Sequence, residues 1–255
     1  MRKIKALISF YTIIPLKEHD MEGAAEVAHF SPLVIGIIVG GLAGIVGMVL
    51  AQILPPCTLC VIVFSILLLL TGFSHIDGLM DVADALMFKG SREERLKVLH
   101  DKYSGSAAVI TVFIVEMISL TSLLTLLPYN LTIMIPLLIV VEVLARIPHI
   151  LLAYMGPPPN YRGLGSIFVS KLYRNRNKIL KSLSATLVTL AILAFLIGIV
   201  IKLIIALILL MITTILFRML IVKNIGFMTG DCLGASIEIS RAIALISLST
   251  NIPIH

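Results

Sequence analysis

Long apolar runs constrain this chain more than any other feature of its sequence. A helix needs about 20 predominantly apolar residues to cross the hydrocarbon core of a bilayer. Seven windows approach or reach that length: residues 33–54, 59–73, 107–127, 131–155, 183–200, 202–222 and 232–249. Only 13% of the 255 residues are charged, and the mean hydropathy of +1.09 is far above that of soluble domains. We therefore predict an all-α polytopic integral membrane protein with about seven transmembrane helices.

The windows indicate one transmembrane catalytic domain, residues 1–255, with a short segment before the first span. Residues 1–32 contain an apolar stretch that is too short to cross a bilayer and that Pro15 interrupts. We expect this N-terminal segment to lie in the membrane interface. The second window is short for a span, and the sequence allows its helix to continue into the polar residues that follow it.

Basic residues gather in four segments that alternating spans place on one side of the bilayer. These segments are residues 1–32, 74–106, 156–182 and 223–231, the last three read as cytoplasmic loops. Because Lys and Arg collect on the cytoplasmic side, we predict a multi-pass cell-membrane protein with its N-terminus and active face inside and its C-terminus outside. The same rule accounts for the net charge of +6, so no nucleic-acid partner is expected.

Three aspartates follow the second window at helical spacing. Asp77, Asp81 and Asp84 stand at i, i+4 and i+7, so on a helix they share one face within an arc of about 60°. Like charges at this spacing repel one another unless a cation neutralises them. Carboxylate oxygens favour Mg²⁺ or Mn²⁺, and a stripe roughly 10 Å long suits two ions, or one ion and a carboxylate base. The alternative is an ordinary helix cap or a solvated surface helix.

Further polar groups fall on the same predicted face. Asp101 and Lys102 precede a turn of small residues. The carboxylate of Asp101 suits a metal ion, whereas the charge of Lys102 and the N–H groups at the start of the third span suit a phosphate. The proline-rich segment after the fourth span runs into Arg162, Gly163 and Gly165, a weak phosphate-binding pattern.

Two more positions concern helix starts. Ser91 and Glu94 have the spacing of a capping box. Asp231 directly precedes the seventh window, where it is either the N-cap or a further metal ligand. Together, the acidic stripe, the further aspartates and the phosphate-binding patterns on one membrane face predict metal-assisted phosphoryl transfer from a diphosphate.

Charged residues also lie inside the predicted spans. Glu142 and Arg146 stand at i, i+4, and Glu238 and Arg241 stand at i, i+3, so each pair can meet on its own helix. An unpaired charge at a helix centre costs on the order of 2.5–3.5 kcal/mol. The spacing does not decide between two roles for these residues, a structural tie between helices or a part in catalysis.

Several blocks of the sequence carry a resemblance to a known family. They are residues 10–15, 30–36, 75–84, 92–105, 161–165 and 229–235. The pattern HxDGLxDxxD together with the later TGDxLGA is specific. In these blocks, which span nearly the whole chain in family order, the sequence resembles the cobalamin synthase family, adenosylcobinamide-GDP ribazoletransferase.

The resemblance implies a Mg²⁺-dependent membrane transferase that joins adenosylcobinamide-GDP to α-ribazole, or to its 5′-phosphate, and releases GMP. A lipid bilayer surrounds such an enzyme, and the chain is compatible with a homo-oligomer. The residues that the resemblance implies are the metal ligands Asp77, Asp81, Asp84 and Asp231, a catalytic base at Asp84 or Asp101, diphosphate contacts at Lys102 and Arg162, and further substrate contacts at His75, Gly163 and Gly165.

The chain departs from the family pattern at two positions. Ala85 stands where the family usually has glycine after the third aspartate, which predicts that the helix runs on past this point. His100 stands where the family tends to have lysine, which leaves one cation fewer at neutral pH.

Two rival functions remain open from the sequence. A CDP-alcohol phosphotransferase carries a related aspartate stripe on a membrane helix, but the residues after Asp77-Gly78 differ from its pattern. A transporter would use Glu142 and Glu238 along a polar path across the bilayer, whereas most acids of this chain cluster at one predicted face.

Overall fold

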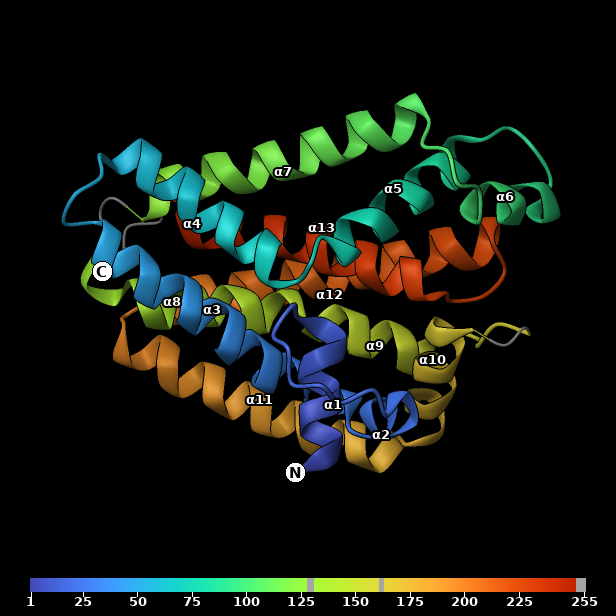
Figure 1. Ribbon diagram of the computed structural model, residues 1–255, viewed down its shortest axis with the longest axis horizontal. Coiled ribbons are helices and arrows are strands. Elements are labelled where there is room, and N and C mark those ends of the chain that lie inside the picture. The colour runs from blue at the N-terminus through green and yellow to red at the C-terminus, as the bar shows by residue number, and fades with distance from the viewer. Residues whose placement is uncertain (128–130, 161–162, 251–255) are drawn as a thin grey trace.

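The computed structural model describes residues 1–127, 131–160 and 163–250, and within these ranges every regular element is helical (Figure 1). The elements are α1 (Arg2–Tyr11), α2 (Met21–Glu26), η1 (Ala28–Phe30), α3 (Ser31–Leu50), α4 (Pro56–Leu70), α5 (Ser74–Met87), α6 (Arg92–Leu99), α7 (Ser106–Leu126), η2 (Leu131–Ile133), α8 (Met134–Ala145), α9 (Ile147–Met155), α10 (Leu164–Arg174), α11 (Arg176–Leu196), α12 (Val200–Asn224) and α13 (Gly230–Ser249). The predicted all-α class is confirmed.

Six stretches of the described chain are long and apolar enough to cross a bilayer. They are Ala28–Leu50, Ser106–Leu126, Leu131–Met155, Asn177–Leu196, Val200–Asn224 and Gly230–Ser249. The pair α4 and α5 makes a seventh if the two bent helices count as one span. The prediction of a polytopic chain with about seven transmembrane helices is therefore confirmed.

The second span does not continue straight into the aspartate stripe, although the sequence allowed such a continuation. α4 and α5 differ in direction by 84°, because Gly72 and Phe73 between them adopt positive φ angles of 62° and 59°. This left-handed turn ends α4, and Ile13 of the N-terminal segment donates to the carbonyl of Leu70 that the end of the helix leaves free, at 2.9 Å. The bend directs α5 along α13 (Figure 1).

Two predicted loops contain helices, of which the aspartate stripe and the capping box had predicted those in the first loop. The segment 74–106 holds α5 and α6, and the segment 156–182 holds α10 and the first turns of α11. Hydropathy windows detect only the apolar part of a helix, so they miss polar turns at its ends. The helix runs on past Ala85, as predicted from this position, and α5 ends two residues later at Met87. α6 begins with the predicted capping box of Ser91 and Glu94.

Glycines let α3 approach α8 closely. A Cβ atom on Gly40 would lie 2.4 Å from the carbonyl oxygen of Leu138, and one on Gly44 would lie 2.7 Å from the Cα atom of Ile135. Small residues at this spacing are typical of contacts between membrane helices, where close backbone approach replaces hydrophobic driving force. Figure 1 shows α6 and α10 at one end of the resulting bundle and the turn between α3 and α4 at the other.

Candidate active site

A cavity of about 250 Å³ lies where α1, α5, α9, α10 and α13 meet. Three residues that the sequence singled out line it: His75 on α5, Gly165 on α10 and Asp231 on α13. Segments about 150 residues apart in the chain therefore form one site, as the distribution of the family blocks along the sequence implied.

The aspartate stripe lies directly beside Asp231, because α5 and α13 touch through a glycine. A Cβ atom on Gly78 would lie only 2.7 Å from the carbonyl oxygen of Asp231, a distance that side-chain carbons do not adopt. Gly78 stands between Asp77 and Asp81 on α5. The charge of Asp231 acts on Asp81, as do the charges of Asp77 and Asp84.

Asp231 is not the N-cap of α13, so that alternative is wrong. Thr229 is the N-cap, and its Oγ1 accepts a hydrogen bond from the backbone N–H of Cys232 at 3.2 Å. Asp231 lies in the first turn of the helix, half-buried, where the helix dipole favours a negative charge. The charge of His100, at the end of α6, also acts on Asp231. The Thr229 hydroxyl donates a hydrogen bond to Asp231 Oδ2 at 3.4 Å.

Asp77 is exposed and Asp81 is half-buried. Within residues 1–127, 131–160 and 163–250, neither carboxylate forms a hydrogen bond or an ion pair with a protein group. A carboxylate surrounded by other carboxylates is unfavourable in its charged form unless a cation balances it. Asp81 is the centre of this four-aspartate group, which consists of Asp77, Asp81, Asp84 and Asp231.

Asp84 has a different environment from the other members of the group. Its two carboxylate oxygens accept hydrogen bonds from the backbone N–H groups of Gly105, at 2.5 Å, and Ala108, at 2.9 Å. These are the N–H groups that open α7, which the sequence suggested would bind an anion. Asp84 is that anion, and it fixes the start of α7 against α5.

The remaining predicted residues lie around this group or outside the described ranges. Asp101 and Lys102 are exposed in the connection from α6 to α7, where Asp101 accepts a hydrogen bond from the N–H of Tyr103 at 3.3 Å. Arg162 lies outside the described residues. Gly163 donates its N–H to Ser166 Oγ at 2.8 Å and thereby caps α10.

Gly165 packs its backbone against the start of α13. A Cβ atom at this position would lie 2.6 Å from the Cα atom of Gly230. The glycines of the predicted phosphate-binding pattern therefore join α10 to α13 beside Asp231, and Gly165 also lines the cavity.

The donor set fits a hard divalent cation by its chemistry. Mg²⁺ prefers carboxylate oxygens and keeps several waters, so one or two protein carboxylates together with substrate phosphates are enough to hold it. In the described residues no three His, Cys, Asp or Glu side chains already stand at coordinating geometry. Three residues would hold the cation. Asp77 and Asp81 have no hydrogen-bonded protein partner in the described part of the chain, and Asp231 is their neighbour.

A buried network of charges lies deeper in the bundle and ties α8 to α13. Arg241 Nε donates to Glu142 Oε1 at 2.7 Å, and the predicted pairs of Glu142 with Arg146 and of Glu238 with Arg241 are both present. These four side chains are at most 1% exposed. The tie between helices that the sequence left open is present, and the pairing makes the burial of these charges tolerable. His75 joins the network to the cavity, with its Nδ1 atom 3.5 Å from Glu238 Oε1.

Sequence reasoning missed two aromatic residues of α1 and a histidine of α9. Phe10 stacks on Phe168 with ring centroids 4.1 Å apart, and the Tyr11 hydroxyl hydrogen-bonds His149 Nε2 at 3.2 Å. Burial raises the pKa of the Tyr11 phenol far above its ordinary value, so Tyr11 serves as a neutral hydrogen-bonding group. A signal existed for His149: a polar residue in an apolar span, three positions after Arg146, marks an inward-facing site.

Comparisons with known proteins identify the family of this chain. The chain matches the family model described as cobalamin-5-phosphate synthase over residues 3–249. It is 32% identical over 249 residues to the adenosylcobinamide-GDP ribazoletransferase of Saccharolobus islandicus (strain M.14.25 / Kamchatka #1), covering 97% of this chain and 90% of that protein. It is 28% identical over 254 residues to the enzyme of the same name from Clostridioides difficile (strain 630), covering 96% of each chain. No solved structure gives a significant match. The chain belongs to the cobalamin-5-phosphate synthase family.

Proposed function

We propose that this chain is an adenosylcobinamide-GDP ribazoletransferase, which joins adenosylcobinamide-GDP to α-ribazole, or to its 5′-phosphate, and releases GMP. The observation that carries the proposal is the four-aspartate group, which the contact at Gly78 assembles beside a cavity in a chain of this family. Four neighbouring carboxylates, of which Asp77 and Asp81 have no hydrogen-bonded partner among the described residues, suit a reaction on a diphosphate that arrives with a cation.

We assign Mg²⁺, with Mn²⁺ as an alternative, to Asp77, Asp81 and Asp231. When bound, such an ion neutralises charge on the bridging and leaving oxygens of a diphosphate. One or two ions are consistent with a stripe roughly 10 Å long.

The remaining residues position the substrates and move a proton. The acceptor oxygen attacks the β-phosphorus, the bond to the GMP oxygen breaks, and the acceptor proton passes to a carboxylate. We assign this base to Asp101, because both oxygens of Asp84 already accept hydrogen bonds from α7. Asp101 directly follows His100, whose charge acts on Asp231. Lys102 and Arg162 would hold diphosphate oxygens.

We further propose that the site faces the cytoplasm, with the N-terminus inside. The support is the distribution of basic residues, since the connections rich in Lys and Arg share one end of the bundle.

The test is release of GMP from adenosylcobinamide-GDP and α-ribazole by purified protein in detergent, with Mg²⁺ or with EDTA. Loss of residues that merely support a metal ligand typically costs 10–100-fold, so we expect Asp81→Asn to reduce turnover by at least about a hundredfold. Glu93→Gln on the exposed face of α6 is the control and should leave turnover unchanged.

Full turnover in EDTA would exclude the metal assignment, and full turnover of Asp81→Asn would exclude the four-aspartate group as the site. Turnover of a CDP-linked alcohol donor in place of adenosylcobinamide-GDP would favour the rival phosphotransferase.

A further inference from the structure

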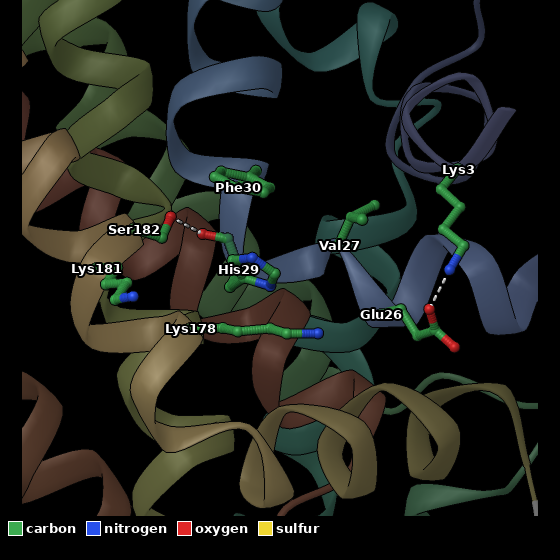
Figure 2. Close-up of a pocket in the computed structure, with 8 residues that line it drawn as sticks. All are labelled: Lys3, Glu26, Val27, His29, Phe30, Lys178, Lys181 and Ser182. Atoms are coloured by element: carbon green, nitrogen blue, oxygen red, sulfur yellow. Dashed lines mark hydrogen bonds and ion pairs between the residues drawn. The ribbon is translucent and has the colours of Figure 1, made fainter. Parts of the chain in front are cut away.

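A second cavity, of about 400 Å³, lies between the N-terminal segment and the start of α11, and it shares no lining residue with the candidate active site (Figure 2). Its lining includes Lys3 on α1, Glu26 on α2, His29 on η1, and Lys178 and Lys181 on α11. Nothing in the proposed reaction uses these residues.

The charge of this cavity is positive. Three lysines face a single carboxylate, and that carboxylate is already engaged, because Lys3 forms a hydrogen bond and ion pair with Glu26. The same hydrogen bond lowers the pKa of Glu26, which keeps the pair charged. Lys178 and Lys181 form no ion pair within the described parts of the chain. Since they stand three residues apart on α11, they share one helix face and repel each other unless an anion lies between them.

His29 supplies an independent indication of a ligand. The side chain is only 5% exposed, and its Nδ1 atom has no hydrogen-bond partner among the described residues. The carbonyl of His29 accepts a hydrogen bond from Ser182 Oγ at 2.5 Å, which fixes η1 to α11 (Figure 2). A buried polar atom without a partner is costly, and because His29 lines the cavity, we infer that its ring contacts a ligand there.

The position of the cavity indicates where such a ligand comes from. Two candidate spans begin at its walls, Ala28–Leu50 and Asn177–Leu196, so the cavity lies at the boundary of the membrane. Apolar side chains flank it on both spans: Phe30 is 39% exposed and Leu180 is 56% exposed. An anionic group attached to an apolar chain fits both features, because its charge meets the lysines while the chain lies along the exposed helix surfaces.

We propose that this cavity binds the phosphate of an anionic phospholipid from the adjoining leaflet, between Lys178 and Lys181 and against His29. Lys3 of α1 lines the same cavity and stays paired with Glu26.

The test compares the protein in nanodiscs of phosphatidylcholine with and without a minor fraction of phosphatidylglycerol, and measures retained phosphatidylglycerol by native mass spectrometry. We expect the wild-type protein to retain it, and the double variant Lys178→Gln/Lys181→Gln to retain it about twenty-five-fold less tightly, at roughly fivefold per lysine. The matched control is Lys89→Gln/Lys97→Gln, which changes two exposed lysines near α6 and should retain the lipid as the wild-type protein does.

Equal retention by both double variants would overturn the proposal. A second experiment, in detergent with inorganic phosphate, distinguishes a lipid phosphate from a soluble phosphate ester. If inorganic phosphate raises the thermal unfolding temperature of the wild-type protein and displaces phosphatidylglycerol, the cavity belongs to a soluble phosphate ester and the lipid assignment fails. No effect of inorganic phosphate, together with loss of lipid in the Lys178→Gln/Lys181→Gln variant, supports the lipid.

Discussion

Asp81 and Asp84 are one helical turn apart on α5 and have different surroundings. Asp84 accepts two backbone hydrogen bonds from the start of α7, whereas Asp81 faces the charges of Asp77 and Asp231. Removing the charge of each residue should therefore have different effects on the stability of the metal-free protein.

We expect Asp84→Asn to lower the free energy of unfolding by about 1–3 kcal/mol, because hydrogen bonds to a charged acceptor are weakened or lost. Asp81→Asn should leave that free energy unchanged or raise it, because like-charge repulsion is relieved. The measurement is denaturant or thermal unfolding in detergent with EDTA present. Equal destabilisation by the two substitutions would contradict the distinction between a helix cap and an uncompensated carboxylate.

At the scale of elements, the site depends on how α5 meets α13. The turn at Gly72 and Phe73 sends α5 along α13, and the missing side chain of Gly78 lets the two backbones touch at Asp231. Any side chain at Gly78 must push the two helices apart and separate Asp231 from the stripe.

Gly78→Ala should therefore destabilise the protein by about 1–3 kcal/mol, the usual range for overpacking, and should reduce GMP release as well. The matched control is Gly41→Ala on α3, where a Cβ atom would have its nearest neighbour at 3.9 Å. In a helix interior that control should be neutral or gain up to about 1 kcal/mol. A Gly78→Ala enzyme with wild-type stability and turnover would show that the close contact is not needed.

At the scale of the whole molecule, the basic connections and the turn between α3 and α4 lie at opposite ends of the bundle (Figure 1). The protein offers a native probe of this arrangement. Cys57 is exposed at the start of α4, whereas Cys60 and Cys232 are buried.

A membrane-impermeant maleimide should label Cys57 from outside intact cells. In a Cys57→Ser background, Lys97→Cys on α6 should be labelled only in inverted membrane vesicles, because α6 lies on the predicted cytoplasmic face. Cys57→Ser alone is the control and should not be labelled from either side. Labelling of both positions from the same side would refute the proposed topology.

Much of this architecture follows from the sequence alone, since hydropathy is a local property. Apolar windows located the spans, including residues 131–155, which α8 and α9 form together. Helical spacing located the pairs of Glu142 with Arg146 and of Glu238 with Arg241, and the motif blocks identified the family. Each of these signals comes from residues within a few turns of one helix or from a short sequence motif.

Only the tertiary structure decided what depends on contacts between distant segments. No local pattern showed that Asp84 caps α7, that Thr229 rather than Asp231 caps α13, or that Arg241 reaches Glu142 across 99 positions of the chain. The turn after α4 was also invisible, because its direction is set by φ angles of Gly72 and Phe73 that packing against the N-terminal segment holds. Spacing along a helix tells which side chains share a face, whereas the backbone of a neighbouring helix determines which of them remain free to bind a ligand.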